Sequence, residues 1–157
     1  MNGVPLTTCD FEISPVLTTL KGEIKATVFE VGGVSPVTAI RTDKDWYVDI
    51  EWFIEGSLVR HLCGDWRVAI ALESIGPGEE YQFPKPAAVV KMDPCGTGIY
   101  QHRINVKAGE VAADEDGTTY ILSVNVGSKD PCGHAGHISA WCTGLHLNFY
   151  QGGPHTP

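Results

Sequence analysis

The chain of 157 residues has little positive charge and no long apolar run. Its 11 Lys and Arg stand against 19 Asp and Glu, which gives a formal net charge of −8. Phosphate backbones and anionic lipid repel such a chain, so we do not expect it to bind nucleic acid. No stretch approaches the roughly 18 apolar residues that a membrane-spanning helix needs. Membrane insertion is therefore not expected either.

The standard catalytic motifs are also missing from the sequence. It contains no Gly-x-Ser-x-Gly, no His-Glu-x-x-His, no phosphate-binding Gly-x-x-x-x-Gly-Lys-Ser/Thr and no strand-linked Gly-x-Gly-x-x-Gly. The carboxylates fall mostly at outward strand positions or in turns. Asp49 and Glu51 form an acidic pair by spacing, and a solvated strand face is the simpler interpretation. These observations favour a protein that is not an enzyme.

The cysteine count and the first residues bear on the compartment. Met1 to Thr8 have neither a basic segment nor an apolar core, so a secretory signal is not predicted there. Five cysteines are an odd number, which a closed disulfide framework cannot use completely. We therefore expect a cytoplasmic protein with free thiols. The cysteines are Cys9, Cys63, Cys95, Cys132 and Cys142.

Period-2 alternation is the clearest positive signal. In residues 46–55 every even position is large and apolar, and residues 66–73 repeat this pattern. Each segment is predicted to be a strand with one face in a core. Because a turn-rich connection joins them, we expect the two strands to be antiparallel neighbours. The inward positions predicted to be buried include Trp46, Ile50, Trp52, Val68, Ile70 and Leu122.

Further strands are predicted along most of the chain. They cover residues 11–16, 23–31, 38–41, 87–91, 100–106, 120–126, 138–142 and 145–150. No window has a sustained helical stripe. We therefore predict an all-β fold, an antiparallel β-sandwich of about eight or nine strands, in preference to a barrel. Residues 1–157 would form a single domain with short irregular tails at both ends.

The strand pattern resembles that of immunoglobulin-like sandwiches. The resemblance is one of pattern alone, because the Cys…Trp…Cys spacing of antibody domains is not evident. It implies loops gathered at the two ends of the sandwich.

The tetrapeptide Asp-Pro-Cys-Gly occurs twice, at 93–96 and 130–133. If residues 100–106 and 120–126 form a hairpin with matched inward faces, Cys95 and Cys132 lie at the same end of the sandwich. Three interpretations stay open: a turn used twice, a Cys95–Cys132 disulfide, or a zinc site. The zinc ligands would be Cys95, Cys132, His134 and His137, a set that suits tetrahedral coordination.

Aromatic residues suggest a contact surface. Trp46, Trp52 and Trp66 sit at inward positions and are expected in the core, as is His102. The neighbours of Trp141 leave its orientation open, and an exposed Trp141 beside Tyr150 would form a binding surface. A module that binds a small ligand or a carbohydrate through the loops at one end of the sandwich is a further alternative.

Together these features predict a non-catalytic binding or assembly protein. It would be a structural subunit of a homo-oligomer or larger particle, with itself or another protein as partner. The Gly- and Pro-rich residues 152–157 have no ladder pattern, and we expect them to contact neighbouring subunits. No cofactor is expected, with zinc as the alternative.

Overall fold

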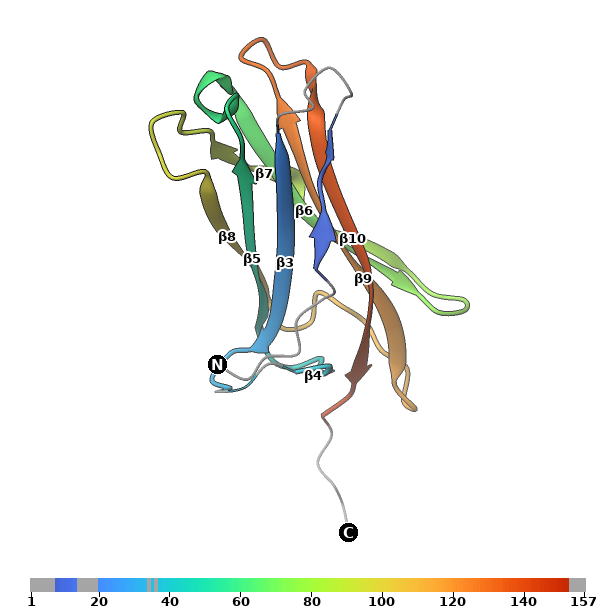
Figure 1. The fold of residues 1–157 in the computed structure, drawn as a ribbon. Coiled ribbons are helices and arrows are strands. Elements are labelled where there is room, and N and C mark those ends of the chain that lie inside the picture. Colours follow the sequence, from blue (N-terminus) through green and yellow to red (C-terminus); the bar gives the residue numbers. More distant parts are fainter. Residues whose placement is uncertain (1–7, 14–19, 34, 36, 153–157) are drawn as a thin grey trace.

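The structure, a computed structural model, describes residues 8–13, 20–33, 35 and 37–152 and consists of two packed β-sheets (Figure 1). The first sheet has four antiparallel strands. Their order is β1 (Cys9–Asp10), β3 (Lys21–Glu30), β5 (Trp46–Glu55) and β8 (Ile99–Val106). The predicted all-β sandwich is therefore confirmed. Residues 14–16 of the predicted first strand and residues 153–157 of the tail lie outside the described residues.

The second sheet faces the first across the core. Its order is β2 (Glu12–Ile13), β10 (Ala135–Tyr150), β9 (Thr118–Lys129), β6 (Asp65–Ser74) and β7 (Glu80–Lys91). A short strand, β4 (Ala39–Arg41), adds to the end of β10 in parallel, and the only described helix is a 3₁₀ turn at Val59–His61. No described helix has the length and apolar character that crossing a membrane requires.

The strand order is compatible with the immunoglobulin-like pattern that the sequence suggests. With β3 as strand A, the sheets read β1-A-B-E and β2-G-F-C-C′, where β5 is B, β6 is C, β7 is C′, β8 is E, β9 is F and β10 is G. Tyr120 lies near the start of β9, and its hydroxyl donates to the Ala112 carbonyl at 2.6 Å. This is the tyrosine corner found at the E–F connection of such folds. Trp66 on β6 is fully buried, as the strand-C tryptophan of immunoglobulin domains is.

The core forms where the inward faces of both sheets meet. Trp66 contacts Phe11, Trp52 and Tyr100, with ring centroids 5.6, 6.1 and 5.7 Å away. The six residues predicted to be buried are each 2% exposed or less: Trp46, Ile50, Trp52, Val68, Ile70 and Leu122. Alternation therefore identified the inward faces correctly, because side chains of a strand alternate between its two sides.

Two predicted pairings are wrong. Residues 46–55 and 66–73 are not neighbours, since β5 belongs to the first sheet and β6 to the second. Residues 100–106 and 120–126 do not form a hairpin either, because β8 pairs β5 while β9 pairs β6 and β10. In both cases the chain crosses from one sheet to the other, as it does in Greek-key sandwiches.

Two strands are longer than predicted. β7 begins at Glu80 and runs through Pro84 and Pro86, which an edge strand tolerates because its outer N–H groups need no partner. The two predicted C-terminal strands are a single strand, β10, with a register shift between Thr143 and Leu145. Gly144 at this bulge has φ +117°, and the extra residue moves the inward positions from even to odd.

A disulfide joins Cys9 of β1 to Cys142 of β10, with Cα atoms 5.7 Å apart. It connects the two sheets at the point where the N-terminal segment passes from one to the other, because β1 pairs β3 and β2 pairs β10. The expectation of free thiols is therefore wrong for these two residues. That expectation followed from the odd cysteine count and the expected compartment, neither of which indicates which two cysteines come together.

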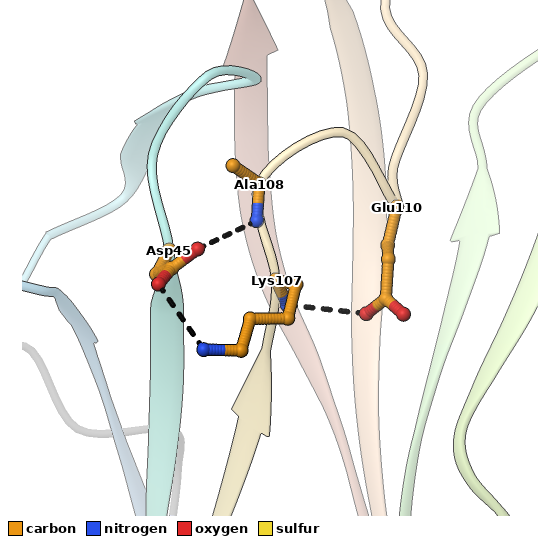
Figure 2. A network of polar contacts seen from close by, with 4 residues as sticks. All are labelled: Asp45, Lys107, Ala108 and Glu110. Atoms are coloured by element: carbon orange, nitrogen blue, oxygen red, sulfur yellow. Dashed lines mark hydrogen bonds and ion pairs between the residues drawn. The ribbon is translucent and has the colours of Figure 1, made fainter.

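At the end of the sandwich where β5 begins, Asp45 ties the β8–β9 connection to the start of β5 (Figure 2). Its carboxylate accepts a hydrogen bond from the Ala108 amide at 2.8 Å and lies 3.5 Å from the Lys107 ammonium. The Lys107 amide donates to Glu110 at 3.1 Å. The Ala108 amide is the main cause that lowers the pKa of Asp45, and Lys107 contributes.

Candidate interaction surfaces

The outer face of the first sheet is a ladder of ion pairs between neighbouring strands. Three pairs run across β3, β5 and β8: Lys21–Glu55 at 2.9 Å, Lys25–Glu51 at 3.5 Å and Arg103–Asp49 at 2.7 Å. Each carboxylate of the predicted acidic pair, Asp49 and Glu51, thus has its own cation. Burying these charges in an interface would remove their hydration, which makes this face a poor contact surface.

Arg103 illustrates how tightly this face is paired. Its guanidinium donates to both carboxylate oxygens of Asp49 and stands 4.0 Å from the centre of the Tyr47 ring. The hydrogen bond to Asp49 raises the pKa of Arg103 further above its already high value. The guanidinium therefore stays charged, and two of its five N–H donors are held by one carboxylate of the chain.

The outer face of the second sheet differs in composition. We define the Trp141 face as three neighbouring outward positions on each of β10, β9 and β6. The register aligns them in three rows: Ser139–Gly127–Arg67, Trp141–Asn125–Ala69 and Thr143–Ser123–Ala71. Arg67, which lies 3.6 Å from Asp65, is the one charged residue of the nine.

Trp141 stands out from this face. Its side chain is 62% exposed, whereas Trp46, Trp52 and Trp66 are at most 2% exposed. The positions next to it on β9 and β6 carry small residues, and Ser123 donates to Thr143 at 2.8 Å. An indole beside short, uncharged side chains on a sheet can cover apolar surface without removing water from ions.

Tyr150 does not belong to the Trp141 face. It lies on the same strand but nine residues further on, next to Arg41 of β4. At the rise of a β-strand this separation is roughly 30 Å. Tyr150 is 42% exposed. The two predicted contact residues are therefore both exposed but do not form one surface.

The two Asp-Pro-Cys-Gly segments adopt the same turn. In the first, Asp93 accepts hydrogen bonds from the Cys95 amide through its side chain (3.0 Å) and from the Gly96 amide through its carbonyl (3.1 Å). In the second, Asp130 does the same for Cys132 and Gly133, at 2.9 Å each. The repeated tetrapeptide thus encodes a repeated turn, one of the three interpretations that the sequence left open.

The second turn holds one further residue. Asp130 also accepts from the His134 amide at 2.9 Å and lies 3.2 Å from the His134 imidazole. The His134 amide is the largest cause that lowers the pKa of Asp130, followed by the Cys132 amide among the hydrogen bonds. The carboxylate therefore organises this turn.

Both turns lie at the same end of the sandwich, as predicted, although the hairpin that suggested it does not exist. Asp65 of β6 is aligned with Lys91 of β7 and with Lys129 of β9, and each turn begins within two residues of one of these lysines. Cys95 and Cys132 are free and exposed, so the predicted disulfide between them is not present. Cys95 and Cys132 lie at the same end because β7 and β9, which precede the two turns, both pair with β6.

The zinc interpretation has no support from the described side chains, among which no three His, Cys, Asp or Glu gather as a metal-binding group. Of its four residues, the side chain of His137 lies outside the described residues. His102, predicted to face the core, is half-buried on β8 opposite Ile50.

Comparisons of the chain with protein-family models, with curated proteins and with solved structures returned no match. Sequence reasoning missed one structural feature, the disulfide, and left a second one, the orientation of Trp141, open. The second had a readable signal, because the inward positions change from even to odd at Gly144 and place Trp141 outward.

Proposed function

We propose that this protein is a non-catalytic structural β-sandwich that self-associates through the Trp141 face. The observation that carries this proposal is the exposure of Trp141, 62%, on a face where eight of the nine residues are uncharged. Tryptophan is the residue type that most often dominates the binding energy of protein interfaces. Leaving an indole in water has a free-energy cost, which a partner surface removes.

A second copy of the chain is the partner that this face suits. Trp141 projects from β10, while the small residues Ser123, Gly127 and Ala71 lie one or two strands away. A two-fold axis parallel to the face, in the plane of the contact, would set each indole over the other copy's small residues. Such a contact is self-complementary, as the common symmetric dimers are.

Charge also favours a second copy. Two chains of net charge −8 repel each other, so they associate best through a face with few charges. Three strands at about 4.8 Å spacing and some five residues of length give the Trp141 face an area of roughly 240 Å². Two such faces bury roughly 480 Å², which is in the range of weak, transient contacts. We therefore expect a reversible dimer.

The Cys9–Cys142 disulfide bears on where this association occurs. Disulfides persist in oxidising compartments and are rare in the reducing cytoplasm. We accordingly propose an oxidising compartment in place of the expected cytoplasmic one. The disulfide is the observation that supports this proposal.

Sedimentation velocity over about 1 to 100 µM chain tests the association. The exposed thiols are first blocked with iodoacetamide without reductant, which leaves the disulfide intact. We expect the full chain to be a dimer with a Kd on the order of micromolar. Trp141→Ala should weaken it by at least about tenfold, because truncating an interface tryptophan typically costs ~2 kcal/mol.

Ile99→Ala is the matched control. Ile99 is, like Trp141, a large hydrophobic residue that is mostly exposed. Its exposed fraction is 58%, and it lies on β8 of the other sheet. Its truncation should leave the dimer unchanged. A full chain that is monomeric at the highest concentration would overturn the proposal. If that monomer were retarded by a soluble polysaccharide in native gels, and Trp141→Ala were not, the face would be a carbohydrate platform instead.

A further inference from the structure

Three of the five cysteines are exposed, free and at the same end of the sandwich. Cys63 lies in the β5–β6 connection, Cys95 in the β7–β8 turn and Cys132 in the β9–β10 turn. Figure 1 shows these three connections side by side, opposite the end that carries β4. We call the three cysteines with their connections the thiol end.

Backbone contacts hold these connections together. The Met92 amide, just before the first turn, donates to the Gly64 carbonyl at 3.1 Å, next to Cys63. Gly64 also packs against the backbone of Lys129 and Asp130, where the second turn begins. The thiol end is thus a single junction of three chain segments. Each contributes one cysteine within four residues of the aligned positions Asp65, Lys91 and Lys129.

The odd number of cysteines has a chemical consequence for the thiol end. The Cys9–Cys142 disulfide uses two of the five cysteines and leaves three. At most two of these three can pair within one chain, so at least one thiol has no intramolecular partner. An oxidant able to form the first disulfide also acts on exposed thiols, whose access to solvent favours exchange. An unpaired cysteine of this kind points to pairing between chains.

We propose that the thiol end is a covalent linkage site, where a disulfide joins it to the thiol end of a second copy. Cys132 is the first point of linkage. Residues 131–136 around it are all exposed, whereas Cys63 and Cys95 each have a half-buried residue immediately next to them. The space around the Gly133 Cα is open, so a second chain can approach the turn closely. A symmetric Cys132–Cys132 bond fits a two-fold axis.

The reaction is a thiol–disulfide exchange in two steps. The Cys132 thiolate of one copy attacks a low-molecular-weight disulfide, such as glutathione disulfide, and releases one glutathione thiolate. The Cys132 thiolate of the second copy then attacks the mixed disulfide and releases the other. Two protein thiols lose two electrons and two protons in total, and glutathione disulfide gains them as two glutathione thiols.

The turn geometry explains why the site stays available. In both Asp-Pro-Cys-Gly turns an aspartate oxygen holds the cysteine amide, which fixes the backbone of each cysteine separately. The sulfur atoms of Cys95 and Cys132 are not joined in the structure, so neither protects the other. A fixed, accessible cysteine on a short turn loses little conformational freedom when it is linked to another chain.

Oxidation of the full chain with glutathione disulfide tests the proposal. Non-reducing electrophoresis and intact mass should show a dimer, with twice the chain mass less two hydrogens for each bond. Cys132→Ser should slow dimer formation by at least about tenfold, and Cys63→Ser and Cys95→Ser by less. The triple variant should remain monomeric on denaturing gels while it keeps its Cys9–Cys142 disulfide by peptide mapping.

Three outcomes would overturn the proposal. One is a chain in which two thiols of this end pair internally while the third carries glutathione and no dimer forms. Another is dimer formation that persists in the triple variant. The third is a bound zinc ion, detected by native mass, that blocks the thiols. Trp141→Ala should still give the covalent dimer, so failure of this proposal is distinguishable from failure of the proposed self-association.

Discussion

Cys9 and Cys142 are joined although 133 positions separate them in the sequence. The bond connects the first described strand of one sheet with the last strand of the other. It therefore closes nearly the whole described chain into one loop. Its position also decides which cysteines remain free, and hence the chemistry available at the thiol end.

Removing this disulfide should destabilise the sandwich strongly. For a loop of this length the chain-entropy model gives a loss of about 5 kcal/mol in the free energy of unfolding. Urea unfolding of the double variant, Cys9→Ala with Cys142→Ala, and of the full chain measures this loss in the free energy of unfolding. Replacing Cys63, Cys95 and Cys132 by serine should change the free energy of unfolding by less than ~1 kcal/mol in total, because all three are exposed. Equal losses in both variants would contradict a structural role for the disulfide.

Truncating the core under β5 should be costly. Ile50 is 1% exposed and packs in the core of the sandwich. Ile50→Ala should lower the free energy of unfolding by about 2–5 kcal/mol, through lost apolar burial and the cavity left behind. Ile99→Ala removes the same atoms from an exposed site and should cost less than ~1 kcal/mol. Similar midpoints for the two variants in denaturant unfolding would refute the assignment of inward faces.

The tyrosine corner predicts an alkaline transition. Burial, followed by the nearby Tyr81, raises the pKa of Tyr120 to about 12. The unfolded value lies near 10, so the folded state holds this proton more tightly. The stability that results is complete below pH 10 and is lost as pH rises toward about 12.

Tyr120→Phe should remove this dependence and cost about 1 kcal/mol at neutral pH, because the Ala112 carbonyl loses its donor. Urea unfolding at intervals between neutral pH and pH 12, with the phenolate absorbance followed in parallel, separates the two effects. The same slope in both proteins above pH 10 would show that Tyr120 is not the group responsible.

Acid should weaken the tie between Asp45 and the β8–β9 connection. The Ala108 amide, with Lys107, holds the pKa of Asp45 below its ordinary value of 3.8. A carboxylate with a depressed pKa contributes stability above its unfolded pKa, and this contribution is lost as pH falls through the folded value. Thermal unfolding of Asp45→Asn and of the full chain should therefore differ most near neutral pH and converge below pH 3.8. A constant difference down to low pH would contradict this account.

Much of the local structure could be read from the sequence. The alternation in residues 46–55 and 66–73 identified two strands and their inward residues, because a strand places successive side chains on opposite sides. Asp-Pro-Cys-Gly encodes its turn in four residues, since the aspartate, the proline and the glycine each favour one part of it. The location of Cys95 and Cys132 at one end was also predicted correctly, although from a hairpin that does not form.

Only the tertiary structure decided which strands pair, which cysteines meet and where Trp141 points. Alternation defines the two faces of a strand but not its neighbours, because backbone N–H and C=O groups bond equally well to any adjacent strand. Cys9 and Cys142 meet because β1 and β10 face each other at the same edge of the two packed sheets, a relation that no local pattern encodes. Trp141 faces outward because β10 absorbs one extra residue at Gly144, and such a bulge takes its register from the partner strand β9.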